Sequence, residues 1–261
     1  MGTPLKNPPV YFTLVQVRFN AILKLSEYLP SIQDEMRKTG FPDFVTRKSM
    51  VLQIATQDGK TIPTTATTER FFFGTTDKKH CFVLAAEALT LQSTDYGTFE
   101  AFSAMFLKGL LLVNQMVQLD FTERVGLRYL DHVTPKNNDT LDDYLAEEVR
   151  GLSARLSGKA LHSFTETLHE VDGVRLLSRV VIQDGSLPFP PDMQPEEMSI
   201  NPRFLSYSGR HAMVDTDGFI EGREVFSADH IGKQLNAIHD VIRIAFRAVV
   251  TEHAFNVWDE K

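Results

Sequence analysis

The sequence of 261 residues contains a single cysteine, Cys81, so no internal disulfide can form. A lone cysteine fits a reducing compartment better than secretion. Cys81 lies in the apolar run 80–84 and is interpreted as a buried strand residue, because a free cysteine behaves as a small hydrophobic side chain. The alternative is a nucleophile activated by His80. Adjacent strand residues point to opposite faces, which disfavours that pairing.

The sequence also lacks hydrophobic runs of membrane-spanning length. Its most apolar stretch, 104–117, is shorter than a membrane span and contains Lys108. The N-terminus shows no hydrophobic signal core, and Lys6 stands where a myristoylation motif requires Ser or Thr. These features predict a cytoplasmic protein that does not associate with membranes.

Positive charge is not in excess, since the formal net charge is −7. Nucleic-acid-binding proteins generally present a basic surface, because neutralising phosphates drives their affinity. The charge balance therefore disfavours nucleic acid and anionic lipid as partners. The hydrophobic fraction of 43% is typical of a globular protein, and a chain of this length can bury a sizeable core.

Recognisable catalytic and cofactor motifs are absent as well. The glycines are scattered and form no phosphate-binding loop, and neither G-x-S-x-G nor H-E-x-x-H occurs. The sequence therefore assigns no catalytic residue, no cofactor and no metal, and it favours a non-enzymatic role.

The pattern of apolar residues predicts an α+β fold. Strands are expected at 10–22, 49–56, 69–75, 81–86, 88–93, 121–133, 160–169, 174–184, 210–215 and 219–225. Helices are expected at 24–38, 98–118, 141–156 and 228–255.

The connections follow from turn-forming residues. Hairpin turns are predicted at Asp58-Gly59 and Asp217-Gly218, and segment 184–203, with five of the twelve prolines, is predicted to be a loop. Two similar halves, 1–135 and 136–261, result. Each is an antiparallel β meander with long amphipathic helices packed on one face, and together they are expected to form one compact unit.

The predicted strand 121–133 carries a row of basic groups. Because side chains alternate along a strand, Arg124, Arg128 and His132 share one face. Such a row is an anion-binding candidate for a phosphate or a partner's carboxylate. The alternative, which we favour, is that Arg128 forms a structural ion pair with an acid such as Glu123 or one near Asp131, because structural pairs are common.

A second polar group lies in the C-terminal half. His211 and Asp215 share a strand face, but two ligands do not make a metal site, and an exposed polar face is the favoured interpretation. The run 215–218 resembles the start of a calcium-binding loop. Phe219 and Gly222 occupy later ligand positions, so a simple turn explains the residues better.

Segment 125–133, Val-Gly-Leu-Arg-Tyr-Leu-Asp-His-Val, resembles the Leu-Arg-Tyr-x-Asn motif of a sporadically distributed bacterial family of uncharacterised proteins of about this length. Leu127, Arg128 and Tyr129 match the motif, and Asp131 stands where the family has Asn. Segments 17–19, 95–99 and 235–246 are similar too, so the resemblance covers nearly the whole chain. It implies no activity, substrate or catalytic residue. The family's patchy distribution implies accessory genes, in a phage-defence or toxin–antitoxin setting.

Two functional hypotheses follow. The first is a non-enzymatic interaction or accessory factor that assembles with another protein or with itself as a homodimer. The second is a nucleic-acid or nucleotide-phosphate binding protein, such as an RNA-processing factor. The face of Arg124, Arg128 and His132 supports the second hypothesis, and the net charge disfavours it.

Overall fold

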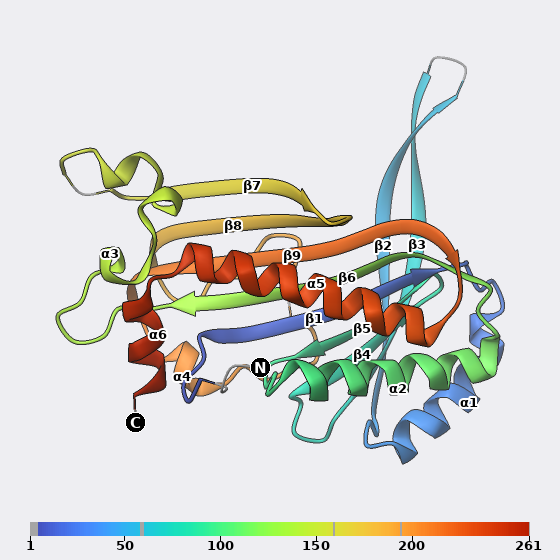
Figure 1. Cartoon of the computed structure of the whole chain (residues 1–261). Coiled ribbons are helices and arrows are strands. Elements are labelled where there is room, and N and C mark those ends of the chain that lie inside the picture. Colours follow the sequence, from blue (N-terminus) through green and yellow to red (C-terminus); the bar gives the residue numbers. More distant parts are fainter. Residues whose placement is uncertain (1–4, 58–59, 159, 194, 261) are drawn as a thin grey trace.

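The computed structural model describes residues 5–57, 60–158, 160–193 and 195–260, with the backbone alone at 50–57 and 60–67 (Figure 1). It confirms the predicted α+β class, with a nine-stranded antiparallel sheet and flanking helices. The strands are β1 (Val10–Phe19), β2 (Asp43–Gln57), β3 (Lys60–Gly74), β4 (His80–Ala85), β5 (Ala88–Ser93), β6 (Phe121–Val133), β7 (Ser163–Val171), β8 (Val174–Gly185) and β9 (Gly209–Val225). The α-helices are α1 (Leu25–Lys38), α2 (Phe99–Val117), α3 (Leu141–Tyr144), α4 (Pro202–Leu205), α5 (Ala228–Val249) and α6 (Glu252–Asp259), and two short 3₁₀ helices lie at Glu147–Val149 and Gly151–Ala154.

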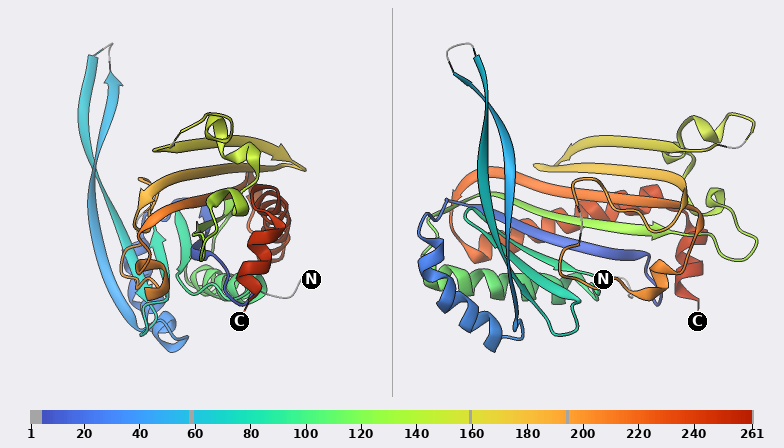
Figure 2. Two further views of the ribbon diagram at one scale, coloured as in Figure 1. Left: turned by 90° about the vertical axis from the view of Figure 1, so that its left-hand side faces the viewer. Right: turned by 180° about the vertical axis from the view of Figure 1, so that it is seen from behind.

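The sheet places β1 and β6 at its centre. The strand order is β2-β3-β4-β5-β1-β6-β9-β8-β7, and Val15 of β1 pairs with Leu127 of β6. Strands β2 and β3 extend beyond the body of the sheet as a long twisted ribbon (Figure 2). The turn predicted at Asp58-Gly59 lies outside the described residues. At the other end of the sheet, β7 forms the edge.

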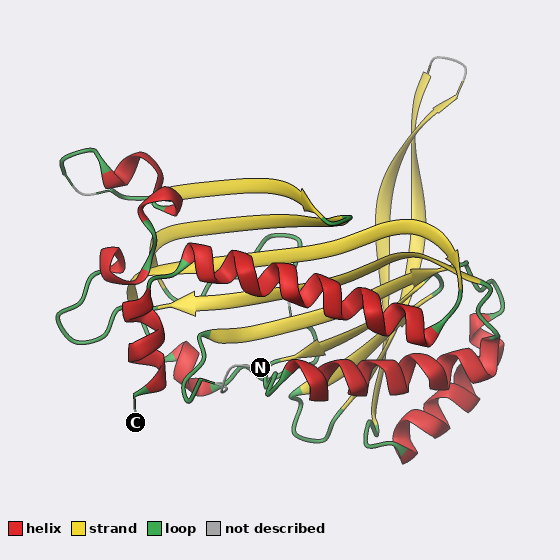
Figure 3. Ribbon diagram, in the orientation of Figure 1, coloured by secondary structure: helices red, strands yellow, loops and turns green. Residues whose placement is uncertain are grey.

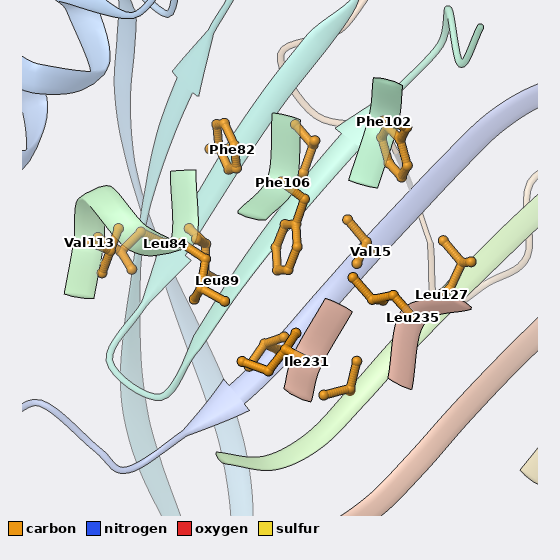
Figure 4. Packing of buried hydrophobic residues seen from close by; sticks show 14 of the residues in the cluster. Val15, Phe82, Leu84, Leu89, Phe102, Phe106, Val113, Leu127, Ile231 and Leu235 are labelled. Carbon is orange, nitrogen blue, oxygen red and sulfur yellow. The ribbon is translucent and has the colours of Figure 1, made fainter. Parts of the chain in front are cut away.

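Helices α1, α2 and α5 cover one face of the sheet, called here the helix face (Figure 3). Helices α2 and α5 are capped at their N-termini by Thr98 and Ser227, whose side chains each accept a hydrogen bond from a backbone N–H of the first turn. Their apolar stripes recur every three or four residues and pack on the sheet. Phe106 of α2 and Leu235 of α5 are examples, and Figure 4 shows this packing. Burying a side chain of this size stabilises the fold by about 1.5–3 kcal/mol.

The opposite face, called here the loop face, is covered by α4 and by the described residues of the proline-rich segment 186–201, which are 186–193 and 195–201 (Figure 2). Phe204 of α4 and Met193 pack against Tyr11, Phe12 and Leu130 of the two central strands. The hydroxyl of Tyr11 also donates a hydrogen bond to the carbonyl of Pro188, 2.5 Å away. The predicted loop therefore packs as a second layer.

The helix predicted at 141–156 is wrong. Helix α3 ends at Tyr144 because Leu145 is extended, with φ −113° and ψ 138°, and forms a β-bridge to Val250. Gly151 then takes a left-handed φ of 62°, which interrupts any continuing α-helix. Leu152 is exposed, although the helical spacing predicts it in the core.

The turn predicted at Asp217-Gly218 is also wrong, because β9 runs unbroken through both residues. Gly218 pairs with Leu127 on one side and Leu176 on the other. A Cβ at this position would lie 2.7 Å from Cγ2 of Ile238, so the glycine lets α5 approach the sheet closely.

The helix predicted at 228–255 is two helices. Val250 is extended, and Thr251 then caps α6 by accepting a hydrogen bond from Ala254 N–H. Among the helices described here, none is both long enough and apolar enough to cross a membrane.

Candidate functional site

A groove of about 590 Å³ lies on the loop face, across the central strands and beside segment 186–201. The polar residues that line it are Gln16, Arg70, Thr90, Gln92, Arg124, Arg128, Asp192, Glu196 and Asp217. Three arginines thus face three carboxylates, so the lining is polar and balanced in charge.

Arg128 lies at the buried end of the groove and is saturated by two carboxylates. Its Nε and Nη2 each lie 2.7 Å from an oxygen of Asp215 on the neighbouring strand β9. Its Nη1 lies 2.7 Å from Asp192 of the loop. Burial favours a neutral guanidine, but the hydrogen bonds to Asp215 and Asp192 outweigh it and raise the pKa of Arg128. The hydrogen bond from Arg128 lowers the pKa of the Asp192 carboxyl.

Arg128 is therefore a structural cross-link between β6, β9 and the loop. The prediction that Arg128 forms a structural ion pair agrees with these contacts, but its partners are Asp192 and Asp215. Glu123, the partner named from the sequence, pairs instead with Arg223. An anion would have to displace a carboxylate to reach Arg128.

The guanidinium of Arg124 has fewer polar partners than that of Arg128. Its guanidinium stacks over the ring of Phe219, 4.5 Å from the centroid, and lies 3.6 Å from the Asp217 carboxylate. Gly126 makes room for it, because a Cβ there would lie 2.6 Å from Nη1 of Arg124. Within the described part of the chain, the guanidinium of Arg124 donates no hydrogen bond. Burial raises the pKa of Asp217, and the charge of Arg124 opposes that rise.

The loop is fastened to the sheet by further ion pairs of the same kind. Glu196 lies 2.8 Å from Arg70 of β3, and Glu197 pairs with Arg47 of β2. With Asp192 and Arg128, each pair joins a carboxylate of the loop to an arginine of a different strand. These carboxylates occupy the places at which a ligand's anionic groups would bind.

His132 shares the loop face with Arg124 and Arg128 but lies outside the groove. It is buried in an aromatic cage, with ring contacts to Tyr11, Phe204, Tyr207 and His211. Burial lowers the pKa of His132 to about 4, and the neighbouring His211 adds to the effect. A neutral histidine in this cage contributes no positive charge to an anion site. The structure thus brings Arg124 and Arg128 together and separates His132 from them.

His211 and Asp215 do not form an exposed strand face, as the sequence predicted. Both are fully covered, because α4 and the adjoining loop pack over this end of the face. His211 Nδ1 lies 2.9 Å from the carbonyl of Gly209. Asp215 forms ion pairs with Arg128 and Arg179. In the described ranges, no group of three or more His, Cys, Asp or Glu side chains is placed to hold a metal ion.

The other face of β6 carries a buried polar chain. The hydroxyl of Tyr129 lies 2.8 Å from that of Tyr96 and 3.2 Å from Nδ1 of His239, whose ring stacks on Phe99. Asp131, two residues beyond Tyr129, is buried, and this burial raises its pKa to about 8.

Cys81 of β4 is buried, as the sequence predicted, and this burial raises the pKa of its thiol to about 12.

Sequence reasoning missed the carboxylates that complete the site. Asp192 and Glu196 lie in the proline-rich segment, which has no periodicity from which a facing strand follows. The sequence signal that could have found these carboxylates is the grouping of acids beside prolines in that segment, at Asp192, Glu196 and Glu197.

Comparison of the chain with protein-family models, curated proteins and solved structures finds no match. The family resemblance of segment 125–133 therefore stays a prediction.

Proposed function

We propose that this chain is a non-enzymatic protein-interaction factor whose loop-face groove binds a carboxylate-bearing segment of a protein partner. The observation that carries the proposal is Arg124. Its guanidinium is fixed in direction by the ring of Phe219, faces the groove and keeps its hydrogen-bond donors available.

The loop supports the chemistry of the ligand. Arg70 and Arg128 line the same groove and already hold the carboxylates of Glu196 and Asp192. Carboxylates therefore fit the arginines of this face, and a partner's Asp or Glu would extend the row to Arg124. Guanidinium and carboxylate groups match geometrically through paired hydrogen bonds.

The floor of the groove suits a polypeptide. Gln16 donates a hydrogen bond to Thr90, 3.1 Å away, and these residues together with Gln92 line the groove. The Oε1 atom of Gln92 is buried without a hydrogen-bond partner among the described residues. This atom is closed off from the groove, so the polar groups that the floor offers to a bound segment are those of Gln16 and Thr90.

The alternative hypothesis, a nucleic-acid or nucleotide-phosphate binder, uses the same arginine. A chain of phosphates in this groove would meet Asp192, Glu196 and Asp217, and it would bind a protein of net charge −7. Repulsion from these carboxylates favours a ligand with one or two carboxylates over a polyanion.

The test compares two arginines that stack on phenylalanine. Arg124→Ala removes the groove arginine. Arg223→Ala is the matched control, because Arg223 stacks over Phe121 at 4.2 Å and pairs with Glu123 outside the groove lining. Binding of a labelled oligoglutamate peptide and of inorganic polyphosphate is measured by fluorescence anisotropy, and native mass spectrometry identifies species that co-purify from the host.

We expect Arg124→Ala to lose oligoglutamate binding and the co-purifying protein, and Arg223→Ala to keep both. Equal losses in the two variants, or no oligoglutamate binding by the unaltered protein, would overturn the proposal. Polyphosphate binding, or a co-purified nucleotide or RNA, that is lost only in Arg124→Ala would replace it with the phosphate-binding alternative.

The proposal extends to the biological setting and to the internal organisation of the chain. The resemblance of segment 125–133 supports a bacterial accessory factor in phage defence or a toxin–antitoxin pair, acting in the cytoplasm. The element order supports two similar halves that divide before β6 and not at residue 135, since β1 and β6 each begin a series that ends in a strand paired back to them and then a long helix, α2 or α5.

A further inference from the structure

The edge of the sheet formed by β7 gathers exposed apolar side chains. Six of the twelve exposed large hydrophobic residues in the described chain lie between 152 and 171. Phe164 and Leu168 of β7 are 55% and 64% exposed, and Leu161 just before the strand is 74% exposed. Apolar clusters of this kind on a folded surface mark interaction sites.

The same strand presents an unpaired backbone edge. Strand β7 is the last in the strand order and pairs only with β8 across the described residues. Natural sheets usually protect such an edge with charged side chains. Here the two glutamates of β7 are neutralised from β8, since Glu166 lies 2.6 Å from Arg179 and Glu170 lies 3.4 Å from Arg175. Segment 149–154 touches only side chains at the start of β7, through Ser163 and Thr165, and no strand of the described chain pairs with the backbone of this edge.

The sequence of β7 is self-complementary in one register. If a second copy of β7 runs antiparallel with Glu166 opposite Glu166, Phe164 lies opposite Leu168 of the copy. On the other side of the strand Thr165 then lies opposite Thr167. The Phe164–Leu168 pair buries apolar surface, which is favourable, while the Thr165 hydroxyl stays bonded to the carbonyl of Val149.

Neighbouring registers lack this match. Centring the pair on Thr167 puts Phe164 opposite Glu170 and Glu166 opposite Leu168. Centring it on Leu168 puts Glu166 opposite Glu170 on both sides of the centre, which makes two like-charge contacts, whereas the Glu166 register has one, Glu166 opposite itself. At the Glu166 centre, each glutamate keeps its own Arg179.

We propose that β7 pairs with β7 of a second copy of this chain, antiparallel about Glu166, so that the two sheets become continuous. The two-fold axis passes beside Glu166, and Phe164 and Leu168 of each copy form the apolar contact. The surface lies at the edge opposite β2, away from the arginine groove, so this inference stands independently of the proposed ligand.

Cysteine cross-linking tests the register directly. The native Cys81 is buried, so introduced cysteines report alone. Glu166→Cys places the thiols of the two copies opposite each other, with their Cα atoms about 4.5–5.5 Å apart, which is within disulfide range. Phe164→Cys alone places the two thiols four residues apart along the pair, about 13 Å. We expect Glu166→Cys to cross-link under mild oxidation and Phe164→Cys not to, whereas an equimolar mixture of Phe164→Cys and Leu168→Cys forms the mixed dimer.

The oligomeric state provides the second measurement. Native mass spectrometry of the full chain should show a dimer that Leu168→Glu converts to monomer, because a new carboxylate meets the apolar contact. Ile244→Glu is the control, since Ile244 of α5 is also 64% exposed but lies away from β7. A monomeric unaltered protein, a dimer that Leu168→Glu leaves intact, or cross-linking that ignores the register would overturn the inference. Loss of oligoglutamate binding with the dimer intact would instead count only against the groove.

Discussion

The two faces of β6 are both buried, yet by different means. On the helix face, Val125 and Leu127 pack under α2 and α5 in one apolar cluster. On the loop face, Arg128 is buried to 7% exposure by a proline-rich loop and is held by Asp192 and Asp215. One strand thus contributes to an apolar core and to an ionic one.

The difference shows what each kind of burial requires. Apolar contacts have no preferred direction, so any side chain of suitable size on α5 stabilises Leu127. A buried guanidinium needs carboxylates at hydrogen-bond distance, and both partners of Arg128 come from more than sixty residues away. The ionic face therefore depends on a few side chains and the apolar face on many.

Arg128→Ala should have the largest effect and would break the loop face. The variant leaves Asp215 buried, with only the 3.5 Å contact to Arg179 for its charge. Loss of one partner from a buried pair costs about 3–5 kcal/mol. Chemical denaturation should show that loss of unfolding free energy at pH 7.

A second substitution separates charge from packing. Adding Asp215→Asn to Arg128→Met removes the stranded charge and restores bulk, so the pair of changes should recover part of the stability lost by Arg128→Ala. If the double variant is as unstable as Arg128→Ala, packing and not charge dominates this face.

Leu127→Ala tests the opposite face at the adjacent residue. The side chain is 1% exposed in the main cluster, and truncation there costs about 3 kcal/mol through lost burial and the remaining cavity. Because no charge is involved, the loss should stay the same between pH 5 and 8 and at raised salt. A strong pH dependence of this variant's stability change would contradict the division between the faces.

The sequence predicts the apolar face well and the ionic face poorly. Stripes such as Phe102, Phe106 and Leu235 follow helical spacing, which places α2 and α5 on the sheet. Alternation likewise places Arg124 and Arg128 on a common face. The partners Asp192 and Asp215 depend on the path of a loop and on the register of β9, which local patterns do not encode.

Some local patterns also mislead. Gly218 satisfies turn chemistry beside an aspartate, but close packing of α5 uses it inside a strand. The apolar spacing of 141–156 is helical, but the bridge of Leu145 to Val250 ends α3 after one turn. In both cases a tertiary contact overrides the local preference.

Asp131→Asn sharpens the comparison, because Asp131 is an acid buried in β6 without a cationic partner in the described structure. Its folded pKa of about 8 lies above the ordinary 3.8, so the folded protein holds a proton that the unfolded chain has lost between those pH values. The native protein should therefore lose stability as pH rises from about 4 to 8, by at most about 1.4 kcal/mol per pH unit.

The asparagine variant lacks this titration. Its stability advantage over the native protein should grow with pH across that window and level off above it. Urea titrations at several pH values measure the difference, in which other titrating groups cancel. A constant difference would show that Asp131 is ionised in the folded state.

Asp192→Asn should have the smallest effect on stability, and it separates the loop from the strands. The Asp192 carboxylate is 59% exposed, so its pair with Arg128 is screened by solvent and its loss costs less than about 1 kcal/mol. Arg128 keeps its ion pair with Asp215, and the global unfolding free energy should barely change.

Segment 186–201 should nevertheless open more often, because one of its ionic contacts is gone. Hydrogen exchange in that segment should accelerate while exchange in β6 does not. Equal acceleration in both would mean that the loop and the central strands open as one unit, and the loop face would then be as cooperative as the helix face.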